Sequence, residues 1–74
     1  MKQTVINKCW ALYSLKKHSQ VIDLTNKILK YDDEYSEAWH LKSLALRRTH
    51  QGVKADYCLQ KAKEYAKVPK SLLE

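Results

Sequence analysis

The sequence has few of the residues that make tight turns, with one glycine and one proline among 74 residues. All-β sandwiches and barrels need turn residues about every 8–12 positions, so the sequence disfavours them. It has only two cysteines, Cys9 and Cys58, which argues against a secreted disulfide scaffold. It also lacks any apolar run of about 18 residues, so we expect no transmembrane helix.

The length of the chain narrows the choice further. A chain of 74 residues forms one domain at most and buries about 60% of the surface that its unfolded form exposes. Separate cofactor and substrate domains are therefore excluded. The segment 1–22 carries no acidic side chain but contains no arginine and no secretory signal. We therefore favour an intracellular, cytoplasmic protein, with a mitochondrial presequence as the alternative.

The charge is positive and unevenly distributed. The formal net charge is +6; residues 1–22 contain four lysines and no acid, and residues 38–54 contain two lysines, two arginines and no acid. Residues 23–37, between these two blocks, carry five acids and two lysines. Such a pattern speeds association with acidic partners. Nucleic-acid binding is one alternative, although no helix-turn-helix, zinc-finger or RNA-recognition signature is present.

Four amphipathic segments predict four helices, over about residues 2–15, 19–31 and 36–49, and then from a turn at Gly52 to about Lys67. Ser19 and Ser36 are the expected N-caps, and Pro69 is expected to end the fourth helix or open another. Short loops between such helices favour antiparallel neighbours. The apolar positions at helical spacing, which form the predicted core, are Val5, Cys9, Leu12, Leu15, Val21, Ile22, Thr25, Ile28, Leu29, Ala38, Trp39, Ala45, Leu46 and Ala55. The fourth helix continues this pattern with Leu59, Ala62 and Tyr65, which we expect to form an exposed apolar set.

The chain contains an internal repeat with a period of about 34 residues. An offset of 34 aligns Lys8 with Lys42, Ala11 with Ala45, Leu12 with Leu46, Lys27 with Lys61 and Tyr31 with Tyr65. Two helix–turn–helix units of this period resemble tetratricopeptide repeats (TPR). The second unit matches through Trp39, Ser43, Leu46, Ala55, Leu59 and Ala62, and the first through Cys9, Leu12, Val21 and Ile28. The glycine usual between the two helices is Lys16 in one unit and His50 in the other.

The resemblance implies an all-α fold of tandem antiparallel helix hairpins, a TPR-like superhelix of four helices with a short C-terminal tail. One domain would then hold a first repeat over about residues 2–35, a second over 36–68 and a tail over 69–74. The first helix of each repeat would line a concave groove for a peptide or helix. The groove positions are Gln3, Ile6, Asn7, Trp10, Tyr13, Glu37, His40, Leu44, Arg47 and Arg48.

Several alternatives stand beside this interpretation. Trp10 could be a packing residue, and Arg47 and Arg48 could form a solvated face. Asn7 matches one residue of the carboxylate clamp with which co-chaperone and immunophilin domains hold chaperone tails. The lysine and arginine of that clamp would fall on Glu37 and Leu41, which cannot replace them. A chaperone-tail binder is therefore a less favoured alternative.

No pattern of catalytic or metal-binding residues is present. Asp32, Asp33 and Glu34 fall between helices, where nothing would desolvate a catalytic carboxylate. The histidines and cysteines lack metal-ligand spacing, and we expect both thiols to be small buried residues. The sequence thus predicts a non-enzymatic interaction scaffold without metal or cofactor, which binds no membrane and whose basic charge suits an acidic protein partner. Two repeats bury little core, so we expect a fragment of a longer array or a homodimer through an exposed end helix.

Overall fold

The computed structural model describes residues 2–66, with side chains from residue 4 onward. These residues form four helices: α1 (Lys2–Ser14), α2 (His18–Tyr31), α3 (Ser36–Arg48) and α4 (Gly52–Tyr65). No strand occurs in the described part, so the predicted all-α class with helical hairpins is confirmed. None of the four helices is both long and apolar enough to span a bilayer. The predicted tail over residues 69–74 lies outside the described residues.

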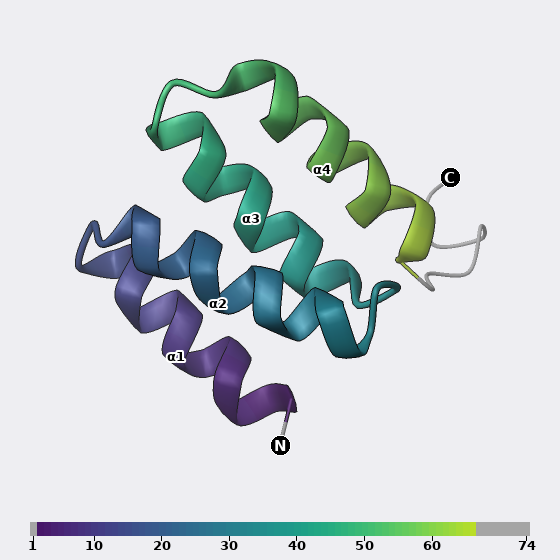
Figure 1. The fold of residues 1–74 in the computed structure, drawn as a ribbon, viewed down its shortest axis with the longest axis horizontal. Helices are drawn as coiled ribbons and strands as arrows, with labels where there is room; N and C mark the ends of the chain where they lie inside the picture. The colour runs from purple at the N-terminus through teal and green to yellow at the C-terminus, as the bar shows by residue number, and fades with distance from the viewer. Residues whose placement is uncertain (1, 67–74) are drawn as a thin grey trace, which may run out of the picture.

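The four helices pack in chain order, each against the next. Figure 1 shows α1 and α2 as one antiparallel pair and α3 and α4 as another, with α2 beside α3. A direct contact between α1 and α3 joins the first helices of the two pairs. The short connections force each helix to turn back along its predecessor. The molecule is therefore built from two helical hairpins, α1–α2 and α3–α4.

The connection after α1 is a left-handed helix cap. Lys16 has a φ of 62°, a conformation that favours glycine. Its backbone N–H donates to the carbonyl of Tyr13, and the N–H of Lys17 donates to the carbonyl of Leu12, both at 2.9 Å. These two bonds define a Schellman motif, which satisfies carbonyl groups that the helix end leaves free. The motif fixes the direction in which the chain enters α2.

The connection after α3 repeats this arrangement one period later in the chain. His50 has a φ of 61°, and its N–H donates to the carbonyl of Arg47. The N–H of Gln51 donates to the carbonyl of Leu46 at 2.9 Å. The helix α4 then begins at Gly52, which was predicted to lie in the turn. The period found in the sequence is therefore present in the backbone hydrogen bonds as well.

The predicted N-caps were wrong. The N-cap residues are Lys17 for α2 and Tyr35 for α3, and neither makes a side-chain capping bond. Ser19 lies inside α2 and Ser36 is the first residue of α3. The first hydrogen bond into α2 runs from the N–H of Val21 to the carbonyl of Lys17 at 3.1 Å. The Schellman cap leads directly into the helix, which begins before the serine could cap it.

The core has a larger and a smaller part. The larger cluster joins α1, α2 and α3 and consists of Ile6, Cys9, Val21, Ile28, Ala38, Leu41 and Ala45. The smaller cluster joins α3 and α4 through Leu46, Ala55 and Cys58. Both free cysteines are buried, as predicted. The two hairpins therefore share the larger core, which holds them together as one unit.

The predicted core was correct in most positions and wrong in a few. Leu15 was expected inside but is 65% exposed, because α1 ends at Ser14 and no longer directs it inward. Thr25 was expected and is fully buried. Its hydroxyl is 2.9 Å from the carbonyl of Val21 and donates back along the helix, so burial leaves no unmet hydrogen bond. Buried positions absent from the predicted core are Ile6, Leu41 and Ser43, and Ala62 of the expected exposed set is buried as well.

Candidate binding surfaces

The first candidate surface lies where α1 meets α3 and is centred on Trp10. This side chain is 38% exposed. Its ring centroid lies 6.2 Å from that of Tyr13, with the two planes nearly perpendicular, and 6.3 Å from that of His40. Edge-to-face contacts at such distances are favourable for aromatic rings. The indole therefore has a large exposed area and a defined position.

A second set of contacts extends this surface to the C-terminal end of α3. The Nε of Arg48 donates to the phenolic oxygen of Tyr13 at 3.3 Å. This bond raises the pKa of Arg48 above its ordinary value, so the guanidinium stays charged. The ring of Tyr13 also packs edge-on against that of His18, at 5.3 Å between centroids. We call Trp10, Tyr13, His40 and Arg48 the aromatic face.

The structure brings four predicted groove residues together in this face but places Ile6 elsewhere. Ile6 is 0% exposed and belongs to the core cluster that contains Leu41 and Ala45 of α3. It was predicted to line the groove because it shares a helical face with Trp10. Since α3 packs against α1, that part of the face is interior. Ile6 is therefore a core residue, and the prediction for it was wrong.

The other predicted groove residues are spread along the two helices. Asn7, Glu37 and Arg47 are exposed and Leu44 is half-buried, while the side chain of Gln3 lies outside the described side chains. Glu37 and His40 also line a separate hollow of about 390 Å³ together with Leu59 and Ala62 of α4. Two of the groove positions expected on the second hairpin, Glu37 and His40, therefore face this hollow. Leu41, which the clamp alternative requires as an exposed donor position, is fully buried.

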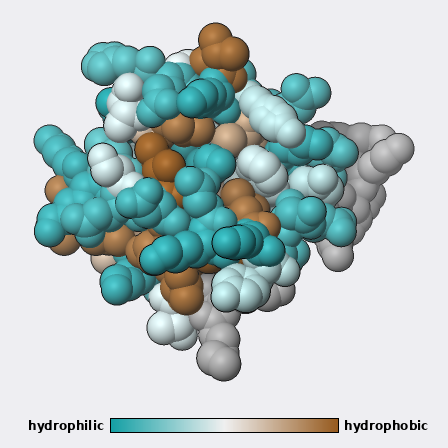
Figure 2. Space-filling view, in the orientation of Figure 1, coloured by the Kyte–Doolittle hydropathy of each residue, from teal (hydrophilic) through white to brown (hydrophobic). Residues whose placement is uncertain are grey.

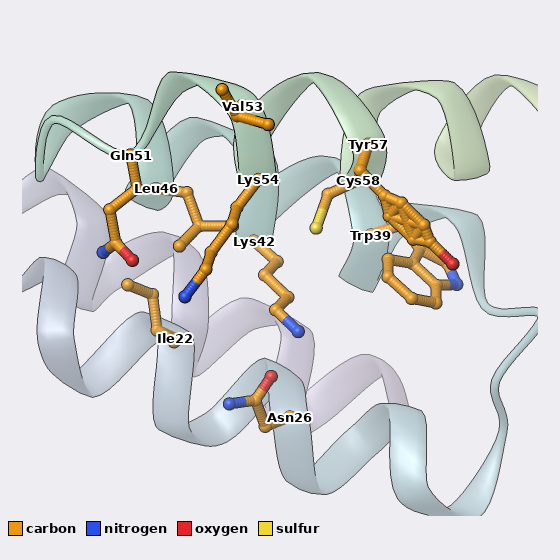
Figure 3. A pocket seen from close by; sticks show the side chains of 10 residues that line it. All are labelled: Ile22, Asn26, Trp39, Lys42, Leu46, Gln51, Val53, Lys54, Tyr57 and Cys58. Carbon is orange, nitrogen blue, oxygen red and sulfur yellow. The ribbon is translucent and has the colours of Figure 1, made fainter.

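The second candidate surface is a hollow of about 440 Å³ between α2, α3 and α4, which was not predicted from the sequence (Figure 3). We call it the α2–α4 hollow. Figure 2 shows that the face seen in Figure 1 carries separate brown patches divided by teal side chains. The residues that line the hollow are Ile22 and Asn26 of α2, Trp39, Lys42 and Leu46 of α3, Gln51 before α4, and Val53, Lys54, Tyr57 and Cys58 of α4.

Trp39 is held firmly at one end of the α2–α4 hollow. Its indole Nε1 donates to the backbone carbonyl of Asp33 at 2.7 Å, which ties it to the loop before α3. Its ring packs nearly perpendicular to that of Tyr57, with 6.0 Å between centroids. The Nζ of Lys42 lies 5.5 Å from the Trp39 ring centroid, close enough for a cation–π contact. The indole N–H of Trp39 thus already has a partner within the chain, and its ring lines the hollow.

A weak sequence signal for this hollow existed. Trp39, Lys42 and Leu46 follow one another at helical spacing and so share one face of α3. The sequence does not reveal that the side chains of α2 and α4 leave space above that face. The spacing alone is equally consistent with a filled core.

The environment of the two cysteines does not activate their thiols. Burial raises the pKa of the Cys58 thiol, although the nearby positive charge of Lys42 opposes the change. The pKa of Cys9 is raised for the same reason and opposed by Lys8. Both thiols are therefore protonated at neutral pH and are poor nucleophiles. Among the described residues, no group of three or more histidine, cysteine or acidic side chains could hold a metal ion.

Comparisons of this chain with protein families, with curated proteins and with solved structures found no match. The class of protein is therefore defined by the fold and the surfaces. The described residues form an all-α fold of two helical hairpins that carries the aromatic face, the α2–α4 hollow and the separate hollow beside Leu59 and Ala62.

Proposed function

We propose that this chain is a non-enzymatic protein-interaction module that binds a peptide or helix of a partner on the aromatic face. The observation that carries the proposal is the exposure of Trp10 together with its fixed contacts to Tyr13 and His40. Tryptophan, tyrosine and arginine dominate binding energy at protein interfaces. A side chain that is already ordered also loses little conformational entropy on binding.

The proposal includes membership of the TPR class. It is supported by the 34-residue period shared by the sequence and the Schellman caps at Lys16 and His50. In that class, the first helix of each hairpin supplies the binding residues. Trp10 and Tyr13 lie on α1, and His40 and Arg48 lie on α3, in agreement with this division.

The charge of the surface favours a partner with an apolar residue next to acidic ones. Arg47 and Arg48 are both exposed at the last turn of α3, beside the aromatic residues. Part of their role is structural, because cations stabilise the negative end of a helix dipole. The remaining positive charge is available to a carboxylate on the partner and would speed its association.

Peptide selection tests the proposal directly. Peptides selected from a random display library against the full chain are labelled, and their affinity is measured by fluorescence polarisation. Trp10→Ala should weaken binding about 30-fold, as expected for a hot spot of about 2 kcal/mol. The matched control is Trp39→Phe, on the other side of α3, which should change affinity little. Unchanged binding by a Trp10→Ala variant with normal helicity would contradict the proposal.

A second arm of the experiment separates protein binding from nucleic-acid binding. Labelled single-stranded RNA and DNA are titrated at about 50 mM salt, where phosphate contacts are strong. We expect no binding stronger than that of an unrelated basic protein. Tight binding that falls steeply with salt would replace the peptide by a nucleic acid as the partner.

The open side of the second hairpin leads to a further part of the proposal. Leu59 and Ala62 of α4 line the hollow of about 390 Å³ beside α3, and no described helix covers it. We propose that another repeat of a longer chain or a second copy of this chain packs there. Sedimentation equilibrium of this chain distinguishes the two, since a stable monomer at high concentration would exclude self-association.

A further inference from the structure

The α2–α4 hollow has the size of a small-molecule site. Its floor on α3 extends from Trp39 to Leu46, which is about 10 Å along a helix at about 1.5 Å per residue. Its volume of about 440 Å³ lies within the range of about 300–1,000 Å³ that is common for ligand pockets. A partner helix of several turns would extend well beyond such a floor. The dimensions therefore favour a compact ligand.

Most of the lining is apolar. Trp39 and Tyr57 form one end, and Ile22 and Leu46 lie toward the other, as Figure 3 shows. The aromatic pair is fixed by its ring contact and by the bond from the Trp39 indole to Asp33. A ligand that enters therefore meets a preformed apolar surface. An alkyl chain or an aromatic ring suits this part of the hollow.

The charged groups of the lining all have the same sign. Lys42 and Lys54 contribute ammonium groups, and no acidic residue lines the hollow. Lys42 is half-buried and Lys54 is exposed, and neither lysine has a carboxylate partner among the residues that the structure describes. Figure 3 shows both side chains extending toward α2, where the amide of Asn26 faces them. A partly desolvated cation without a counter-ion is stabilised by an anion that enters beside it.

We propose that the α2–α4 hollow binds a small apolar monocarboxylate, with its carboxylate between Lys42 and Lys54 and its apolar part against Trp39 and Leu46. The carboxylate accepts hydrogen bonds from the two ammonium groups and from the amide of Asn26. This site shares no residue with the aromatic face. It is therefore independent of the proposed peptide binding, and either proposal can fail without the other.

Octanoate is the probe, and NMR of the unmodified chain is the measurement. The chain has two tryptophans, so the indole N–H signal of Trp39 reports the hollow and that of Trp10 serves as an internal control. Octanoate should shift the Trp39 signal saturably and leave the Trp10 signal in place. Octan-1-ol, which keeps the chain but lacks the charge, should bind at least about tenfold more weakly. Octylammonium should not bind.

Charge removal tests the role of the lysines. Lys42→Met and Lys54→Met keep the length of the side chain, and each should weaken octanoate binding about three- to tenfold. The matched control is Lys30→Met, an exposed lysine of α2 outside the hollow, which should have no effect. If a variant fails to fold, intermolecular NOEs between octanoate and the Trp39 ring in the unmodified chain locate the ligand.

Four results would overturn the proposal. Equal binding of octanoate and octan-1-ol would show an apolar site without charge selectivity. Octanoate affinity that survives the double change of Lys42 and Lys54, or NOEs to residues outside the hollow, would place the ligand elsewhere. A blocked peptide with leucine between two glutamates is the last probe. If this peptide shifts the indole N–H signal of Trp39 and octanoate does not, the hollow binds a peptide and not a small carboxylate.

Discussion

The two helical hairpins have nearly the same backbone but bury different positions. Ile6 in α1 and His40 in α3 are one repeat period apart and occupy the same place in their hairpins. Ile6 is 0% exposed, whereas His40 is exposed. The caps that close α1 and α3 are equivalent, so local backbone geometry does not explain the difference.

The difference comes from what packs against each first helix. Helix α3 lies against α1 and covers Ile6. The corresponding side of α3 has no further described helix on it and forms the wall of a hollow with Leu59 and Ala62. In a repeated backbone, a given position is therefore core or surface according to whether a neighbour follows. Burial in such a chain is a property of the array, and it cannot be assigned to a position within the single hairpin.

Alanine substitution at these two positions should produce the largest contrast. Ile6→Ala removes a fully buried side chain from the shared core and should lower the free energy of unfolding by about 2–5 kcal/mol. His40→Ala changes an exposed position and should lower it by about 0.5 kcal/mol or less. Urea unfolding followed by circular dichroism measures both. Similar losses at the two positions would show that the hairpins do not differ in this way.

Glycine substitution at the two caps should have a smaller, stabilising and nearly equal effect. A left-handed conformation costs a residue with a side chain about 1–2 kcal/mol, and glycine avoids this cost. Part of the gain is offset because glycine loses about 0.5–1 kcal/mol more conformational entropy on folding. Lys16→Gly and His50→Gly should therefore each raise the free energy of unfolding by about 0.5–1 kcal/mol. Thermal and urea unfolding measure the change.

The residues that follow the caps are the matched controls. Lys17 has a φ of −91° and Gln51 a φ of −116°, both ordinary values for any residue. Lys17→Gly and Gln51→Gly remove no left-handed strain, because neither residue has a positive φ. Both substitutions should lower the free energy of unfolding, since only the entropy cost of glycine remains. If Lys16→Gly stabilises and His50→Gly does not, the equivalence of the two caps is wrong.

The sequence was sufficient to predict the helices and their period. The four segments keep apolar residues at helical spacing, and positions such as Val21, Ile28 and Ala55 were assigned to the core correctly. These features depend on local sequence, which a single chain displays in full. Lys16 and His50 were aligned with the inter-helix glycine of the family, but the left-handed caps at these residues were not predicted.

The sequence was not sufficient where a third element decides the outcome. Ile6 looked like a surface residue because its helical face also carries Trp10, and only the packing of α3 makes it interior. The α2–α4 hollow depends on how Trp39 and Tyr57 rest against each other across two helices. Ser19 and Ser36 matched the usual residue types for N-caps, but the Schellman motif and the loop geometry started both helices earlier.

The smallest effect should come from the pH dependence of the two buried thiols, one in each hairpin. Burial raises the pKa of both Cys9 and Cys58 above the ordinary 9.0. As the pH rises, the thiols of the unfolded chain therefore ionise first, and ionisation favours the unfolded state. The stabilisation from each neutral thiol is complete below pH 9.0 and is lost as the pH passes through its folded pKa.

Alanine variants isolate this contribution from the lysines and tyrosines that titrate nearby. The free energy of unfolding of the unmodified chain, Cys9→Ala and Cys58→Ala is measured by urea at pH 7, 8, 9 and 10. Relative to each variant, the unmodified chain should lose stability as the pH rises above 9.0, since all other groups are common to both. The thiol of Cys58 lies in the smaller core and borders the α2–α4 hollow. If the difference in free energy of unfolding between the unmodified chain and Cys58→Ala stays constant with pH, while that for Cys9→Ala does not, water in this hollow solvates the Cys58 thiolate.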